Sequence, residues 1–412
     1  MTQPDEGQTY CWIDGPAALA EIADDWRALA EITGADVYMI PDWTLTWWTH
    51  FGAGRTLTAL VARRVDGSLA GLLPFMIDTI RIGPLPIRVA RLAATDPHAV
   101  ILALPVAAEI LHDMLTRAVS DLLGGVSAPL AVTFTPASER GPLLDAVRAI
   151  IPSGSTTAAF TGKQELRCVD RKMGTHTAFE LPKTFDDYLA ALSKKRRSQF
   201  RRDLKNLREA HGMTAQFRHP DARDFAEFVT FHDKQWRETG KGGHFTDWRG
   251  SAAFYSDLSD RLQPRGNIWL DRQDSAAGPL AAQFSLVSDQ VCHWRLPART
   301  IDPELDRLSV GKVGLILMIE RLIANGVRRI EAGVGAYDYK LVYGGEAVPV
   351  HRLIVTRATL SARLQLALLL GWARLLHLSY YRLWFGRLAP RLRKLVPWPH
   401  RPLWASWIRS RI

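Results

Sequence analysis

The stretch from Leu308 to Gly345 constrains the fold of this chain more than any other part of its sequence. Ser309-Val310-Gly311-Lys312 precedes a broad apolar segment, and Asn325-Gly326 follows as a typical helix end. Arg329 to Val334 then has the composition of a short strand. A polar aromatic cluster comes directly after it, beside two glycines: Tyr337, Asp338, Tyr339, Lys340 and Tyr343. The sequence therefore predicts a helix, a strand and a loop rich in titratable side chains, which is typical of a functional site.

Two motifs in this region and one upstream resemble a known superfamily. S-V-G-K at the helix start and G-x-G-x-Y-D-Y-K-x-x-Y-G-G after the strand resemble the C-terminal half of a GNAT acetyltransferase. The upstream motif, F-x-x-Y-L-x-x-L-S, begins at Phe185 and runs into a basic segment. The closest subgroup is the tandem, Fem-like one associated with cellulose and exopolysaccharide biosynthesis. The resemblance covers residues 174–355 well and the first 165 residues more loosely.

The predicted hairpins occur twice, which favours a duplicated unit. Thr56–Arg64, the Asp66-Gly67 turn and Leu69–Ile77 form the first hairpin, and Asn267–Arg272 with Leu280–Val287 forms the second. A third strand is expected at 290–295. With the resemblance, this predicts an α+β fold of two tandem GNAT-like domains, each with a mixed, mostly antiparallel sheet flanked by helices. We expect a structural or acceptor-binding first domain at 1–165, a catalytic domain at 166–357 and a helical tail at 358–412.

The resemblance implies acyl transfer, in general acetyl transfer, from acetyl-CoA or another acyl-CoA, with no metal. A helix N-terminus can bind the donor's pyrophosphate because its N–H groups and dipole favour anions. The expected donor-binding residues include two strand positions whose backbone N–H groups polarise the thioester carbonyl: Arg295, Leu296, Ser309, Val310, Gly311, Lys312 and Gly314.

The expected catalytic residues follow the predicted strand. Lys340 can stabilise the developing oxyanion, and Tyr339 or Tyr343 can protonate the leaving thiolate. Asp338 or Glu331 can orient or deprotonate the acceptor. The chain shows no nucleophile motif such as G-x-S-x-G, so direct attack on the thioester is expected. Mid-strand His293 and Trp294 are expected to be core residues.

The segment Lys194–Glu209 carries eight Lys and Arg against two acids, Asp203 and Glu209. Such crowding of like charge costs helix stability, which favours an anionic ligand. We assign Arg196, Arg197, Arg201 and Arg202 to a substrate: CoA phosphates, a nucleotide-linked sugar, a lipid-linked glycan or tRNA. The expected acceptor is a small molecule or glycan.

Two other functions stay open from the sequence. One is aminoacyl transfer from a charged tRNA, as in the peptidoglycan-bridge transferases. The usual GNAT signature Q/R-x-x-G-x-G/A is altered here, with Gly311 followed by the next glycine at 314, which weakens the case for CoA. The other is a catalytically silent assembly subunit of polysaccharide biosynthesis. The sequence leaves the oligomeric state open.

The net charge of +10 comes from the tail. Residues 358–412 contain ten Lys and Arg and no Asp or Glu, so the remaining chain is neutral overall. The tail also holds five tryptophans, which favour membrane interfaces: Trp372, Trp384, Trp398, Trp404 and Trp407. We expect it to lie on an anionic membrane surface without crossing it. The alternative is a helical hairpin, turning at Pro390 and Pro397, that folds onto the second domain.

The N-terminus has no apolar run of the kind a secretory signal needs, and three distant cysteines fit reduced thiols: Cys11, Cys168 and Cys292. These features predict a cytoplasmic protein, or one peripheral to the inner face of the cell membrane.

Overall fold

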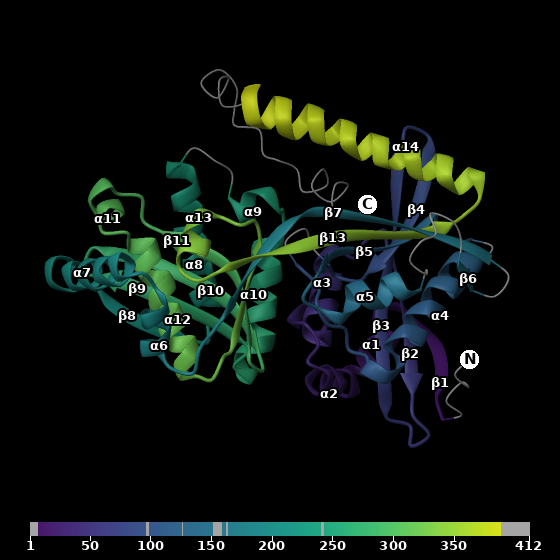
Figure 1. Cartoon of the computed structure of the whole chain (residues 1–412), viewed down its shortest axis with the longest axis horizontal. Coiled ribbons are helices and arrows are strands. Elements are labelled where there is room, and N and C mark those ends of the chain that lie inside the picture. The colour runs from purple at the N-terminus through teal and green to yellow at the C-terminus, as the bar shows by residue number, and fades with distance from the viewer. Residues whose placement is uncertain are drawn as a thin grey trace. The chain divides into compact units, whose positions relative to one another are not determined.

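The computed structural model describes residues 7–95, 99–125, 127–150, 159–161, 164–239 and 243–388 (Figure 1). The chain divides into two compact units: unit 1 comprises residues 1–174 and 349–412, and unit 2 comprises residues 175–348. Strands β7 (Gln164–Glu180) and β13 (Glu346–Arg357) each run from one unit into the other. These limits differ from the expected ones at 165 and 357. Residues 349–357 belong to unit 1, in which β13 pairs with β5.

Unit 1 contains a sheet with the strand order β1-β2-β3-β4-β5-β13, in which only the β4–β5 pair is parallel. The predicted first hairpin is confirmed, since β2 and β3 pair from Thr56↔Ile77 to Arg63↔Leu69. Gly67, in the turn between them, has φ +85°, a conformation that favours glycine. The strand bounds are β1 Thr9–Asp14, β2 Thr56–Arg63, β3 Leu69–Ile82, β4 Leu85–Leu92, β5 Ala131–Ser138 and the short β6 Ala159–Thr161.

Unit 2 contains the remaining strands of the same 13-stranded sheet, in the order β7-β12-β11-β10-β9-β8. The predicted second hairpin and third strand are β9, β10 and β11, which are antiparallel neighbours. The predicted helix and strand that follow are α12 (Val310–Ala324) and β12, and Gly326 beyond the helix has φ +80°. The strand bounds are β8 Thr214–Arg218, β9 Ile268–Ser275, β10 Gly278–Ser288, β11 Val291–Arg299 and β12 Arg329–Val334.

Helices flank the strands of each unit (Figure 1). In unit 2, α12 is apolar on nearly all sides because it packs against the sheet and is also contacted by α6 and α7. The loop expected after β12 contains a short helix, α13. Unit 1 has α1 Gly15–Glu21, α2 Ala23–Thr33, α3 Pro41–Phe51, α4 Leu111–Gly124, α5 Pro142–Ala149 and α14 Leu360–Leu376. Unit 2 has α6 Phe185–Ala191, α7 Lys194–His211, α8 Ala222–Glu238, α9 His244–Asp247, α10 Ser251–Leu262, α11 Pro303–Arg307, α12 and α13 Asp338–Val342.

The two units repeat one plan. Each has an antiparallel meander followed by a helix and then a strand that pairs in parallel with the meander's last strand over three residues. These parallel pairs are β4–β5 in unit 1 and β11–β12 in unit 2. The predicted fold class, two tandem α+β domains with mostly antiparallel strands flanked by helices and a helix at the C-terminal end, is confirmed. The strands of both domains belong to one sheet, whereas a sheet for each domain was expected.

The first helix of the tail, α14, packs onto unit 1. Ala362, Leu366, Leu369 and Ala373 share a buried cluster with Ile87 of β4 and other side chains of that sheet. The alternative of a hairpin on the second domain therefore does not hold for α14. After α14 the helix continues as π-helical turns from His377 to Leu388. Among the described residues, no helix combines the length and hydropathy that a bilayer span requires. Three of the tail's tryptophans and both of its expected prolines lie outside the described residues: Trp398, Trp404, Trp407, Pro390 and Pro397.

A charged cluster ties β13 to β7 within unit 1. His351 Nδ1 lies 2.7 Å from Asp170 and its Nε2 lies 2.8 Å from Glu139. Arg148 Nη2 also donates to Asp170, at 2.7 Å. Burial acts to raise the pKa of Asp170, but the hydrogen bonds and charges of His351 and Arg148 lower it overall.

Candidate active site

Strands β11 and β12 separate after three parallel pairs, the last of which is His293↔Glu331. Beyond that pair β11 stays beside β10, whereas β12 stays beside β7. At the point of separation β11 has a bulge: Trp294 and Leu296 pair with consecutive residues of β10, so the ladder skips Arg295. A bulge redirects backbone groups at the edge of a ladder. The two strands therefore frame an opening, and Arg295 lies at its apex.

The first turn of α12 lies at the far end of β11. A Cβ added to Gly311 would sit 2.9 Å from Cδ of Arg299, the last residue of that strand. Ser309, just before the helix, has φ +52°. Arg299 is held by an ion pair with Asp306 and by a hydrogen bond to the carbonyl of Thr300 at 3.3 Å. The charge of Arg299 is thus paired with Asp306, and the half-buried Lys312 brings positive charge to a turn whose backbone N–H groups attract anions.

Gly314 serves the packing of α12 on the sheet. A Cβ at this position would lie 2.5 Å from Oε1 of Gln273 and 3.2 Å from Nε2 of Gln283. These side chains belong to β9 and β10. Gly314 is therefore a helix–sheet contact, and its role in donor binding stays a prediction. Val310 is also buried, so only its backbone can take part in binding.

Lys340 of α13 reaches into the opening between β11 and β12. Its Nζ donates to the main-chain oxygen of Ala332 on β12 at 2.5 Å. The same atom lies 5.6 Å from the ring centroid of Trp294 on β11 and 5.3 Å from that of Tyr337. The residue is 5% exposed, and burial lowers the pKa of Lys340 to about 8.

Tyr339 lies beside this lysine, whereas Asp338 does not. The Tyr339 ring stacks on Tyr337 at 6.1 Å between centroids and meets Trp294 edge-on at 6.3 Å. Burial raises the pKa of Tyr339 to about 12. Asp338 is exposed at the start of α13. Of the two, Tyr339 is the residue that the structure places next to Lys340.

Tyr343 anchors the loop after α13. The residue is 2% exposed, and its main-chain oxygen accepts a hydrogen bond from the hydroxyl of Tyr188 on α6 at 2.9 Å. Burial raises the pKa of Tyr343, against the hydrogen bond and charge of Arg196, and nearby Asp203 adds to the increase. Tyr343, three residues after Lys340, therefore lies beside Arg196 of the basic helix.

The four arginines assigned to substrate have different surroundings in α7. Arg197 donates to the main-chain oxygens of Leu189 and Ala190 at 3.1 and 2.8 Å, which caps α6. Arg202 pairs with the buried Asp203 at 2.8 Å. These two arginines therefore have structural contacts within unit 2.

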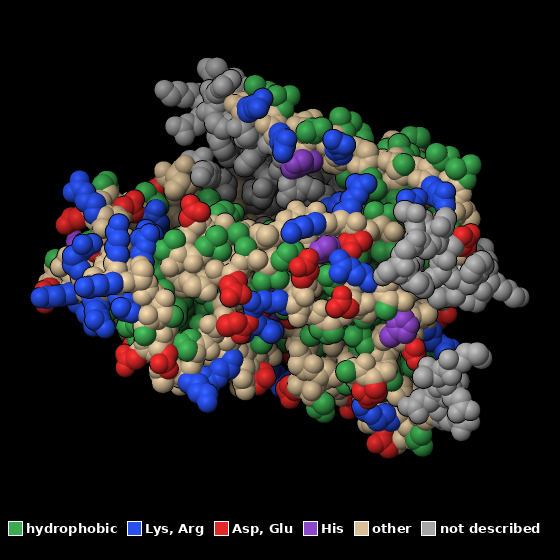
Figure 2. All heavy atoms as spheres, in the orientation of Figure 1, with side chains coloured by type: hydrophobic (Ala, Val, Ile, Leu, Met, Phe, Trp, Pro, Cys, Tyr) green, Lys and Arg blue, Asp and Glu red, His purple; other side chains and the backbone are tan. Residues whose placement is uncertain are grey.

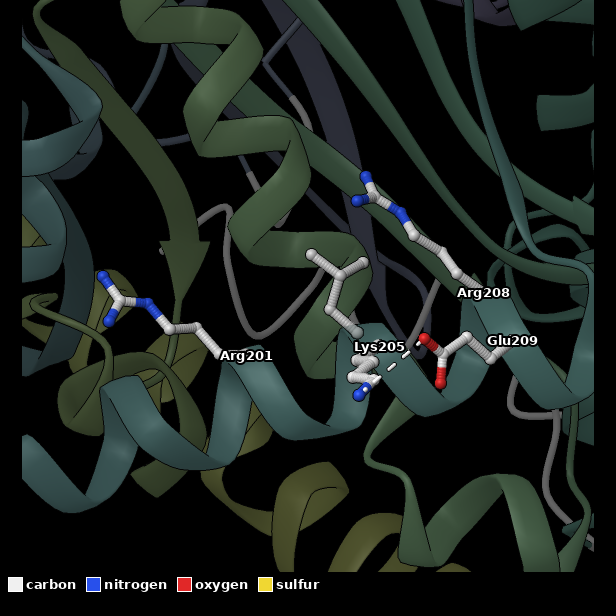
Figure 3. Close-up of a pocket in the computed structure, with 5 residues that line it drawn as sticks. Arg201, Lys205, Arg208 and Glu209 are labelled. Carbon is white, nitrogen blue, oxygen red and sulfur yellow. Dashed lines mark ion pairs between the residues drawn. The ribbon is translucent and has the colours of Figure 1, made fainter.

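Arg201 is exposed and lines an open groove of about 290 Å³ along α7 (Figure 3). Lys205 and Arg208 share this groove, although the sequence pattern did not single them out. Lys205 faces Glu209 at 3.9 Å. Figure 2 shows Lys and Arg side chains gathered over α7, at the left of the view. An anionic ligand would therefore meet Arg201, Lys205 and Arg208, which one helix presents at a spacing of three to four residues.

Sequence reasoning missed a buried network at the last parallel pair. His176 of β7 lies 3.0 Å from Glu331 through Nδ1, and Arg329 lies 3.0 Å from the same carboxylate. Burial acts to raise the pKa of Glu331, but the hydrogen bond and charge of His176, with the charges of His293 and Arg329, lower it overall. Burial also lowers the pKa of His293 to about 4. The alternation of buried residues along each strand accounts for the burial of His176 and His293 separately. Only the pairing of β7, β11 and β12 brings both histidines to Glu331.

Residues 194–341 match the family model described as an acetyltransferase (GNAT) domain. This range contains the opening between β11 and β12, the first turn of α12 and Lys340. The second unit is a GNAT domain.

The fold of the chain is shared with FemX, at a TM-score of 0.56 and 10% identity over 80% of this chain and 95% of FemX. A conserved protein of unknown function from Bacteroides thetaiotaomicron aligns at a TM-score of 0.49 and 10% identity, over 84% of this chain and all of that one. L-PGS from Bacillus licheniformis aligns at 0.47 and 12%, over 84% and 95%. No curated protein matches the chain.

Unit 1 repeats the GNAT plan but fills the corresponding opening with its own backbone. There β4 and β5 separate after Arg91↔Thr133. Ile101 then occupies the free edge of β5: its N–H donates to Pro136 at 3.0 Å, and its carbonyl accepts from Ser138 at 3.3 Å. The GNAT domain of unit 2 instead places the Lys340 side chain between its strands.

Proposed function

We propose that the GNAT domain transfers an acyl group, in general acetyl, from an acyl-CoA thioester directly to an amine or hydroxyl of a carbohydrate or cell-envelope precursor. The observation that carries this proposal is the arrangement along β11. The bulge at Arg295 and the buried Lys340 lie at one end of the separated segment, and the first turn of α12 lies at the other.

The residues along β11 fit an extended CoA thioester. Arg299 follows Trp294 by five residues, which is about 17 Å along a strand. A donor with its pyrophosphate at Gly311 and Lys312 would therefore present its thioester near Lys340. The backbone N–H groups of Arg295 and Leu296, which lie at the bulge of β11, would then polarise the thioester carbonyl.

The reaction needs no covalent enzyme intermediate. The acceptor nitrogen or oxygen attacks the thioester carbon, the C–S bond breaks, and the thiolate leaves with a proton. Lys340 would stabilise the negative charge that develops on the carbonyl oxygen, because an ammonium held in a buried site acts with little screening. Tyr339, whose phenol stays protonated at neutral pH, would supply the proton to the thiolate.

Glu331 is the proposed base for the acceptor. Its carboxylate stays ionised in a buried site beside His176, and it lies at the pair where the strands separate. Asp338 is exposed and has no comparable position. In unit 1 the segment around Ile101 takes the corresponding space, which supports a structural or acceptor-binding role for that unit.

A second donor, a charged tRNA, is favoured by one observation: the groove formed by Arg201, Lys205 and Arg208. Cations along a helix attract a phosphate backbone. Calorimetry of the full chain with acetyl-CoA, CoA and a charged tRNA separates the two donors. The proposal expects saturable binding of both CoA forms. Binding of tRNA alone would replace CoA as the donor, and binding of neither would favour a silent assembly subunit.

Charge reversal tests the groove itself. Arg201→Glu with Arg208→Glu is expected to weaken the anionic ligand about tenfold or more and to reduce the slope of affinity against salt. Arg223→Glu is the matched control, because Arg223 is 89% exposed on α8 and pairs with Glu227 of the same helix at 3.9 Å. If the α7 variant and the control behave alike, the groove does not bind the substrate.

A further inference from the structure

Helix α14 has two opposite apolar faces. One face packs on the sheet of unit 1 through Ala362, Leu366, Leu369 and Ala373. The leucines of the other face point away from the sheet. At 100° per residue, the exposed leucines of α14 centre roughly 150–170° from the buried set. A helix needs one apolar face to dock on a sheet, so the second face has another role.

The outer face is a leucine stripe interrupted only at Gly371. The exposed fractions are 71% for Leu360, 64% for Leu364, 46% for Leu368 and 54% for Leu375. These four residues span about 22 Å of helix. Leu378 and Leu383 extend the exposed set into the π-helical turns, at 43% and 50%. Exposed leucines that occur singly need no explanation, but a stripe of this length does.

The charges beside this stripe have one sign. Arg363 and Arg374 of α14 are exposed, as are Arg382 and Arg387 in the π-helical turns. Residues 358–388 contain no Asp or Glu. Figure 2 shows Arg side chains beside hydrophobic ones along this helix, at the top of the view.

We propose that the outer face of α14, together with Leu378 and Leu383 of the π-helical turns, binds the surface of an anionic lipid bilayer, with the helix lying in the plane of the interface. Leucines enter the boundary between headgroups and acyl chains, and the flanking arginines meet lipid phosphates. The charges favour this occupant over a second helix, because helix pairs place acids and bases opposite each other beside an apolar seam. The inner face keeps α14 attached to unit 1, so the helix lies flat on the membrane. This surface is independent of the acyl-transfer chemistry.

Flotation of the full chain with vesicles tests this surface. The wild type is expected to float with vesicles of 30% phosphatidylglycerol in phosphatidylcholine and to lose binding as salt increases. With vesicles of pure phosphatidylcholine it is expected to remain in the soluble fraction. Leu364→Glu with Leu368→Glu is expected to lower partitioning at least tenfold, and so is Arg363→Glu with Arg374→Glu. Ile32→Glu is the matched control, since Ile32 is 84% exposed on α2 and should leave partitioning unchanged.

Circular dichroism melting of each variant separates loss of binding from loss of folding, because all five side chains are exposed. The proposal is wrong if the folded wild type fails to float with anionic vesicles at low salt, or if the leucine and arginine variants float as well as Ile32→Glu. It is also wrong if light scattering shows a dimer that the leucine variant dissociates and the wild type does not bind vesicles. That result would make a second copy of the chain the occupant.

Discussion

The charge of Lys340 should make the stability of this protein depend on pH in a defined way. Burial lowers the pKa of this lysine from 10.5 to about 8 in the folded chain. The unfolded chain therefore binds more protons between about pH 8 and 10.5, and the free energy of unfolding should rise with pH across that range. Replacing Lys340 with Met removes the titrating amine and keeps most of its length.

The size of the effect follows from the two pKa values. Relative to pH 7, the lysine should add about 2 kcal/mol to the free energy of unfolding by about pH 9.5. At pH 7 the wild type still bears the cost of burying the ammonium. The hydrogen bond from Nζ to Ala332 offsets part of this cost, because a hydrogen bond to a charged group contributes about 1.5–3 kcal/mol. The pKa of Lys340 is still lowered, so the compensation is incomplete.

Urea denaturation of the wild type and Lys340→Met between pH 7 and 9.5 measures this contribution. The difference between the two stability curves should change by about 2 kcal/mol in favour of the wild type as the pH rises. Lys234→Met is the control, because Lys234 is 63% exposed on α8 and should follow the wild type. Parallel curves for the wild type and Lys340→Met would refute the argument that a buried, charged lysine lies between β11 and β12.

The same variant tests the chemistry. If Lys340 stabilises the oxyanion, Lys340→Met should lower release of CoA from acetyl-CoA by about 10²–10³-fold while the donor Kd stays nearly constant. Thiol release, with water or a panel of amino sugars as acceptor, gives the rate, and calorimetry gives the Kd. Equal losses in Kd and rate would assign Lys340 to donor binding.

Three further predictions rest on other contacts. Gly311→Ala should weaken acetyl-CoA binding with little change in melting temperature, whereas Gly314→Ala should mainly lower the melting temperature. Calorimetry measures the binding and thermal melting the stability; unchanged acetyl-CoA binding by Gly311→Ala would show that the donor lies elsewhere. Glu331→Gln should reduce CoA release about 10²-fold or more at unchanged donor Kd, and a rate equal to that of the wild type would exclude Glu331 as the base. Because the pKa of Asp170 is lowered in the folded state, its stabilisation is present above pH 4 and is lost as the pH falls through the folded value. His351→Ala should lower the free energy of unfolding by about 1–3 kcal/mol at pH 7 and should make it depend less on pH below pH 4. An unchanged dependence on pH in that range, measured by denaturation, would contradict the prediction.

The sequence by itself determined the local elements of the protein. Both hairpins, α12 and β12 could be predicted from strand alternation, from the Asp66-Gly67 turn and from the Asn325-Gly326 helix end, because these signals act within a few residues. Their repetition and the motif around Lys340 also indicated a duplicated GNAT plan. The absence of acidic residues from the tail is likewise a property of the sequence alone.

Only the tertiary structure decided what these elements meet. Residues 349–357 join unit 1 because they pair with β5, and no local pattern specifies which strand will be the partner. For the same reason, the opening between β11 and β12 and the network of Glu331 with His176 could not be predicted from the sequence. Both arise where distant strands pair and then separate. The sequence shows that Gly314 has no side chain, but only the packed fold shows that Gln273 fills the space beside it. Long-range pairing and packing, which residue-by-residue patterns do not encode, place the candidate site.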